Sequence, residues 1–148
     1  RQVITRITNQ YEHTNMKKIR RKDLVYPDLS YKIVGILYDV YNTLGSGYSE
    51  KHYAEAIAEE FKRQGINFAQ EVVFPISYKG SKIGFNRLDF LIEQRLILEL
   101  KRSGRFSRTN IEQIFDYLKS TNLKLAILAN ITSQGVVFRR VVNSYIRK

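Results

Sequence analysis

Two short apolar segments carry acidic residues at positions where a buried strand would have apolar ones. Residues 87–92 contain Asp89, and residues 97–101 contain Glu99. An unpaired charge in an apolar environment costs several kcal/mol, so these acids must meet a metal ion, a counter-charge or water. A divalent metal site is the sharpest explanation of the pattern, and a cross-strand ion pair on a solvated sheet edge is the alternative.

The second segment also places a lysine beside one of the acids. Side chains on a strand alternate between its two faces, so Glu99 and Lys101 share a face, about 6.6 Å apart along the chain. Leu98 and Leu100 then point to the other face. One face is expected to pack in the core and the other to carry chemistry.

The composition limits the metal to a hard ion with oxygen ligands. The chain has no Cys and only two His, so thiolate and histidine metal cages are excluded. Mg²⁺, with Mn²⁺ as a substitute, is the expected cofactor, bound by Asp89 and Glu99. Such an ion polarises a phosphodiester and lowers the pKa of an attacking water, while Lys101 would orient that water or stabilise negative charge.

The charge balance favours a polyanionic partner. Lys and Arg total 25 against 14 Asp and Glu, which gives a net charge of +11 and a pI near 9.9. Nucleic acid is the expected partner, DNA before RNA. The residues expected to bind it are Lys17, Lys18, Arg20, Arg21, Lys22, Arg102, Arg105 and Arg108. Taken singly, each also fits an ordinary solubilising surface charge.

No run of 18 or more apolar residues and no signal-peptide pattern occurs in the sequence. We therefore expect a cytoplasmic protein without membrane contact.

The pattern of apolar residues predicts a basic, flexible arm over residues 1–27 and a single domain over residues 28–148. The domain is of the α/β (mixed α+β) class, with helices covering a sheet. Helices are expected over 30–44, 49–64 and 110–120, and strands over 68–77, 83–92, 96–101, 123–129 and 135–142. A hairpin turn is expected at residues 78–81.

Two helices carry further candidate residues. Glu50 falls within the apolar stripe of the second helix and is expected to point inward, although a Glu in a first turn is also favoured by the helix dipole. Gln113 and Tyr117 lie four residues apart on one face of the last helix and fit either a site or an ordinary boundary pair. The Tyr-rich first helix is expected in the core, with a homodimer interface as the alternative.

Five segments in this order resemble the GxxExxY family of the PD-(D/E)xK nuclease superfamily, over roughly residues 28–142. They are Gly47-x-x-Glu50-x-x-Tyr53, Tyr78-Lys79-Gly80, Arg87-Leu88-Asp89-Phe90, Leu98-Glu99-Leu100-Lys101 and Gln113-x-x-x-Tyr117. The resemblance implies a restriction-endonuclease-like core with a central mixed β-sheet flanked by helices. It also implies nuclease activity.

The resemblance assigns roles to several residues. It implies that the backbone carbonyl of Leu100 is a third metal ligand, that Glu50 holds a metal-bound water or a second ion, and that Gln113 and Tyr117 set the site and contact the substrate. The sequence departs from the family at Asn110, where relatives generally have His, and at Arg102, where they have a small residue.

The leading hypothesis is therefore a Mg²⁺-dependent nuclease that hydrolyses phosphodiester bonds of DNA or RNA. The alternatives are a non-catalytic nucleic-acid-binding protein on the same scaffold, and an oligomerising module that uses the Tyr-rich helix.

Overall fold

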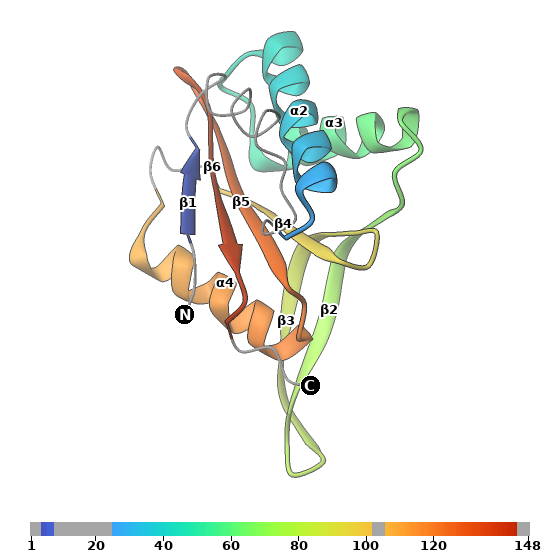
Figure 1. The fold of residues 1–148 in the computed structure, drawn as a ribbon, viewed down its shortest axis with the longest axis vertical. Helices are drawn as coiled ribbons and strands as arrows, with labels where there is room; N and C mark the ends of the chain where they lie inside the picture. Colours follow the sequence, from blue (N-terminus) through green and yellow to red (C-terminus); the bar gives the residue numbers. More distant parts are fainter. Residues whose placement is uncertain (1–3, 8–24, 102–105, 145–148) are drawn as a thin grey trace.

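A six-stranded mixed sheet forms the centre of the structure, a computed structural model that describes residues 4–7, 25–101 and 106–144 (Figure 1). Its strand order is β1-β6-β5-β4-β3-β2, and the β4–β5 pair is parallel whereas the other neighbours are antiparallel. The strands are β1 (Ile4–Ile7), β2 (Phe68–Tyr78), β3 (Ser81–Ile92), β4 (Leu96–Leu100), β5 (Leu125–Thr132) and β6 (Gly135–Val142).

Helices cover both faces of this sheet. Helices α2 (Pro27–Leu44) and α3 (Glu50–Arg63) pack on one face, and α4 (Arg108–Thr121) packs on the other. The mixed α+β class expected from the sequence is confirmed. No helix within the described residues is long and apolar enough to cross a membrane.

The helix ends follow local capping chemistry. Ser49 accepts a hydrogen bond from the backbone N–H of His52 at 3.2 Å and so begins α3. Helix α4 begins two residues earlier than expected, because Ser107 and Asn110 form a reciprocal capping box with N···O distances of 3.0 and 3.1 Å. Asn110, which departs from the family pattern, thus caps the start of α4.

The tyrosines of α2 pack in the core expected for them. Tyr38 is buried, and Tyr41 packs against the cluster that α2 and α3 form with the sheet. These side chains therefore contribute to the fold of the domain itself.

Strand β1 lies within the segment expected to be a flexible arm. Its backbone pairs antiparallel with β6, with Ile4 opposite Val141 and Ile7 opposite Phe138. At these four residues the expectation of an arm is wrong, since β-branched residues favour strands and β6 offers an edge. The expected arm is also wrong at its end, since Val25 and Tyr26 pack against the core and Pro27 begins α2. Residues 1–3 and 8–24 lie outside the described residues, so there the arm stays a prediction.

The β2–β3 hairpin turns at Lys79 and Gly80, as expected. Their φ angles of 49° and 84° are both positive, which is the geometry of the two-residue turn whose twist matches paired strands. The hairpin extends beyond the helices at one end of the molecule (Figure 1).

An aromatic cluster anchors α3 to the strands that lead to the acidic residues. The ring centroids of Phe61 and Phe90 are 5.5 Å apart, and both residues are fully buried. Phe68 lies 5.3 Å from Phe61 and 6.1 Å from Phe90. This packing fixes the position of the β3 segment that contains Asp89.

Replacement of Phe61 by alanine should lower the free energy of unfolding by about 3–5 kcal/mol, because it removes a buried ring and leaves a cavity. Urea unfolding measures this. The matched control is Phe85→Ala, which removes an exposed ring and should change stability by less than about 0.5 kcal/mol. Equal losses in the two variants would contradict the described packing.

Candidate active site

Strands β3 and β4 separate at the two acidic residues. Their pairing runs from Ile92↔Leu96 to Phe90↔Leu98, and the next opposed positions would be Asp89 and Glu99. There the backbone N–H of Asp89 donates to Glu99 Oε1 at 2.6 Å, and that of Leu100 donates to Asp89 Oδ2 at 2.8 Å. Each carboxylate thus replaces a backbone acceptor of the facing strand and holds the strands apart.

The other edge of β4 continues without interruption. Leu100 pairs with Ala129 of β5, and the backbone N–H of Lys101 donates to the Ala129 carbonyl at 2.8 Å. In an extended strand, the N–H and C=O of one residue point to the same side. The Leu100 carbonyl is therefore directed toward the gap where its N–H meets Asp89.

A local twist of the β2–β3 pair accompanies this gap. Leu88 packs in the α4 cluster whereas Phe90 packs in the α2–α3 cluster, although side chains two apart normally share a face. Glu71, beside this point on β2, has a φ of 50° in the left-handed region. The twist therefore occurs at Asp89, and the strained backbone lies beside it at Glu71.

Lys101 lies between Glu99 and helix α4. Its Nζ atom donates to Gln113 Oε1 at 2.9 Å and lies 4.0 Å from Glu99 Oε2. The structure thus brings Glu99, Lys101 and Gln113 together on the α4 side of the sheet. The alternation of side chains predicted that Glu99 and Lys101 share this face.

Tyr117 lies one turn after Gln113 on α4 and is buried. Burial, together with the negative charges of Glu99 and Asp89, raises the pKa of its hydroxyl to about 12. The phenol therefore keeps its proton near pH 7 and can serve the site as a hydrogen-bond donor.

The two carboxyl groups share an environment with too little positive charge. Burial and the neighbouring Asp89 raise the pKa of Glu99 to about 8, and burial raises the pKa of Asp89. One oxygen of each carboxylate accepts a backbone N–H, while the other accepts no hydrogen bond from the described residues. These two oxygens, with only the Lys101 ammonium at 4.0 Å from Glu99 Oε2 beside them, fit the donor set of a hard divalent metal.

The ligand set is small. Among residues 4–7, 25–101 and 106–144 no group of three His, Cys, Asp or Glu side chains is placed to hold a metal. The two carboxylates and the Leu100 carbonyl would therefore share the ion with water or a substrate oxygen, as open catalytic sites do.

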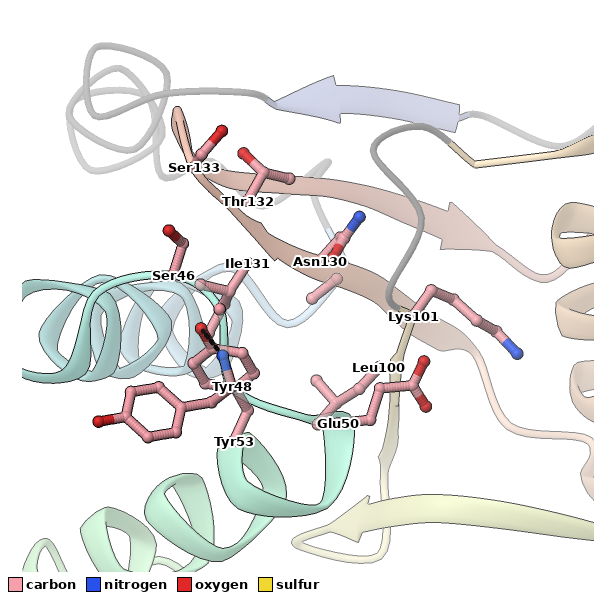
Figure 2. Close-up of a pocket in the computed structure, with 12 residues that line it drawn as sticks. Ser46, Tyr48, Glu50, Tyr53, Leu100, Lys101, Asn130, Ile131, Thr132 and Ser133 are labelled. Atoms are coloured by element: carbon pink, nitrogen blue, oxygen red, sulfur yellow. Dashed lines mark hydrogen bonds between the residues drawn. The ribbon is translucent and has the colours of Figure 1, made fainter.

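Glu50 lies where two pockets meet, between α3 and the end of β4. One pocket, of about 310 Å³, also contains Tyr53, Lys101 and Asn130 (Figure 2). The other, of about 380 Å³, contains Asp89 and Arg87, and Glu50 and Leu100 line both. The Glu50 carboxylate points toward the end of β4, as expected from its position in the apolar stripe.

Asn130 of β5 lines the first pocket and was not among the residues expected from the motifs. Its side chain is 2% exposed, and its Nδ2 atom has no hydrogen-bond partner within the part of the chain that the structure describes. A signal was present, since Asn130 follows the continuous apolar run 125–129 much as Asp89 interrupts an apolar strand.

Of the eight expected nucleic-acid-binding residues, Arg108 lies among the described residues. Arg108 is exposed at the start of α4, with its Nε atom 3.4 Å from Glu112 Oε2. The others lie outside the described residues: Lys17, Lys18, Arg20, Arg21, Lys22, Arg102 and Arg105.

The chain belongs to the PD-(D/E)XK nuclease superfamily, whose family description it matches over residues 27–141. The superfamily named from the motifs is thus confirmed. Among proteins with curated descriptions, none matches the chain.

Two solved structures resemble the fold. The crystal structure of SSO0001 aligns with a TM-score of 0.48 and 16% identity over 89% of this chain and 61% of that protein. An alkaline exonuclease (LHK-Exo) from Laribacter hongkongensis aligns with a TM-score of 0.47 and 10% identity over 89% of this chain and 76% of that protein. The chain thus spans about three fifths of the length of SSO0001.

In metal-free buffer, the free energy of unfolding should fall as pH rises from about 4.5 to about 8. In this window the unfolded chain ionises Glu99 while the folded protein keeps the proton, so each pH unit costs up to about 1.4 kcal/mol. Urea unfolding in chelator at several pH values measures the slope.

Glu99→Gln should flatten this slope, because the amide does not titrate and can still accept the N–H of Asp89. Glu59→Gln, which alters an exposed carboxylate of α3, is the matched control and should leave the slope unchanged. A slope in Glu99→Gln as steep as in the wild type would show that Glu99 is not the group responsible.

Proposed function

We propose that this protein is a divalent-metal-dependent nuclease that hydrolyses phosphodiester bonds of nucleic acid. The observation that carries the proposal is the pair of carboxylates on separated strands, each fixed by a backbone N–H of the facing strand, with Lys101 Nζ at 4.0 Å from Glu99 Oε2. Superfamily membership and the net charge of +11 support it. The further likeness to GxxExxY proteins is consistent with the same chemistry.

Asp89, Glu99 and the Leu100 carbonyl would hold the ion, which we expect to be Mg²⁺ or Mn²⁺. When bound, such a cation polarises the phosphate and makes water a better nucleophile. The backbone N–H groups that bind one oxygen of each carboxylate fix the orientation of the other oxygen. The protein thus sets the ligand geometry before a substrate arrives.

Lys101 supplies a fixed positive charge beside this pair. Gln113 accepts one of its three N–H bonds, so the ammonium is held in place and retains donors for a water or a phosphate oxygen. Negative charge that develops on the phosphate is stabilised best by donors that need not reorganise. In this role Gln113 is a positioning residue and Lys101 is catalytic.

Glu50 and Tyr117 complete the site from its two sides. Glu50 approaches from the α3 side, where a carboxylate can accept a proton from a water or hold a second cation. Tyr117 approaches from the α4 side as a neutral donor, since its pKa is about 12. Nucleic acid would enter through the pocket that contains Asp89 and Arg87.

Asp89→Asn and Glu99→Gln should each lower the cleavage rate by at least about 100-fold, because loss of an ion ligand removes several kcal/mol of stabilisation. Both amides can still accept the backbone N–H bonds, so the fold should persist. Cleavage of labelled single-stranded and duplex DNA and RNA, with Mg²⁺, with Mn²⁺ and with chelator, tests the prediction.

Lys101→Ala separates the roles within the site. It should lose cleavage to a similar degree but bind Mn²⁺ at least as tightly as the wild type, because it removes a cation and no ligand. Calorimetric titration with Mn²⁺ measures the binding. Wild-type rates in Asp89→Asn would indicate a contaminating nuclease and remove the support for the proposal.

Gln113→Ala should lower kcat by about tenfold with little change in Mn²⁺ affinity, since the Lys101 ammonium loses its fixed position. Gln113→Glu keeps an acceptor at the same place and should recover most of the rate. Single-turnover cleavage measures kcat. Equal loss of Mn²⁺ binding in both variants would mean that Gln113 supports the ligands instead.

A further inference from the structure

One hairpin carries most of the exposed apolar side chains of the described residues. Apart from Tyr48, the large hydrophobic side chains that are strongly exposed all lie on β2 and β3 or their turn: Val73 (45%), Tyr78 (59%), Ile83 (66%) and Phe85 (51%). This hairpin projects past the helices (Figure 1). Its apolar side chains are therefore available to a partner.

The strand register gathers four of its residues on one face. Val73 lies opposite Arg87, Pro75 opposite Phe85, and Ser77 opposite Lys82. Because opposed side chains of antiparallel strands share a face, Val73, Lys82, Phe85 and Arg87 form one strip, which we call the hairpin strip.

The opposite face of the hairpin is already occupied. Val72, Phe74 and Leu88 pack in the cluster beneath α4, and Asn86 Nδ2 donates to Ser120 Oγ at 3.0 Å. The hairpin strip therefore faces away from α4, which packs against the other face of the hairpin.

Cations lie against the exposed rings. Lys82 Nζ is 5.6 Å from the centroid of the Phe85 ring, and the Arg87 guanidinium carbon is 6.0 Å from it. Near the turn, Lys79 Nζ lies 5.3 Å from the ring of Tyr78. Stacking rings beside positive charges are the surface that binds unpaired bases and their phosphates together.

The hairpin strip is continuous with the active site. Arg87 belongs to the strip and also lines the pocket that contains Asp89. The eight residue steps from Asp89 to Ser81 at the turn extend about 27 Å. That length equals about eight base steps of a stacked strand.

We propose that the β2–β3 hairpin is a binding arm for a single nucleic-acid strand, which stacks bases on Phe85 and contacts Lys82 and Arg87 through its phosphates as it leaves the catalytic pocket. This proposal rests on the proposed nuclease function, because the bound nucleic-acid strand is assumed to run from the active site at Asp89 outward along the hairpin.

A second copy of the chain fits the hairpin strip less well. Strand β2 is a sheet edge, but Pro75 has no N–H to donate and Glu71 departs from extended geometry, so strand addition is obstructed. Two copies would also bring Lys79, Lys82 and Arg87 near their own counterparts, whereas a phosphate chain complements them.

The test uses the full chain with Asp89→Asn, in chelator so that no cleavage occurs, and fluorescence anisotropy with labelled oligothymidylates of about 4 to 20 nucleotides. Affinity should rise with length until about eight nucleotides lie beyond the pocket and then level off. Phe85→Leu should weaken binding of the long oligonucleotides by about tenfold and leave the affinity for the shortest ones unchanged. Phe85→Tyr, which keeps an aromatic ring, should bind the long oligonucleotides as the parent does.

Lys82→Ala should lower the slope of log affinity against log salt by about one, because one phosphate contact is lost. Lys124→Ala, an exposed lysine between α4 and β5, is the matched control and should leave the slope unchanged. Urea unfolding of each variant shows whether the fold is intact.

Any of three results would overturn the proposal of a binding arm. The first is an affinity that does not depend on oligonucleotide length, and the second is equal affinity of Phe85→Leu and the parent. The third is a dimer, seen by size-exclusion chromatography with light scattering, that Phe85→Ala dissociates. Because Asp89→Asn in chelator removes cleavage from the experiment, these results are independent of the nuclease proposal. Conversely, if the wild type does not cleave nucleic acid, the nuclease proposal fails while the binding measurements on the hairpin remain valid.

Discussion

The site depends on two side-chain-to-backbone hydrogen bonds across β3 and β4, from the Asp89 N–H to the Glu99 carboxylate and from the Leu100 N–H to the Asp89 carboxylate. Each carboxylate accepts a backbone N–H from the opposite strand, at 2.6 and 2.8 Å, where a sheet would otherwise continue its ladder. Two buried carboxylates side by side repel each other, and Lys101 compensates only in part. The electrostatic repulsion between the two carboxylates therefore remains partly uncompensated, and a divalent cation held between them would relieve it.

The rest of the fold makes this local opening tolerable. All five residues of β4 are buried, and apolar clusters cover the sheet on both faces, so the strands can separate at the acids without loss of the core. Helix α4 brings Gln113 and Tyr117 to one side and α3 brings Glu50 to the other. The hairpin that carries Asp89 continues outward as the hairpin strip, so the proposed catalysis and the proposed strand binding would share one element.

Much of this could be predicted from the sequence, because it depends on local periodicity. The end of α2, the bounds of α3, the turn at Lys79 and Gly80, and the shared face of Glu99 and Lys101 follow from side-chain alternation and local capping and turn residues. Helix α2 begins three residues earlier than expected, at Pro27, where no side chain caps it. The pairing of β1 with β6 could not be predicted, since it joins short segments far apart in the chain. Nor could the left-handed Glu71 be predicted, because it depends on tertiary contacts. The capping role of Asn110 is local but was missed, because a capping box usually has Glu or Gln at that position. The buried Asn130 was missed although it follows an apolar run.

The most direct test is a crystal of the protein soaked in Mn²⁺, with diffraction collected where manganese scatters anomalously. We expect one strong anomalous peak within about 2.3 Å of carboxylate oxygens from both Asp89 and Glu99, with the Leu100 carbonyl on its coordination sphere. The peak should vanish in Asp89→Asn. Ordered carboxylates that point to different surfaces, or an ion bound elsewhere and unaffected by that substitution, would contradict a shared metal site and with it the proposed hydrolysis.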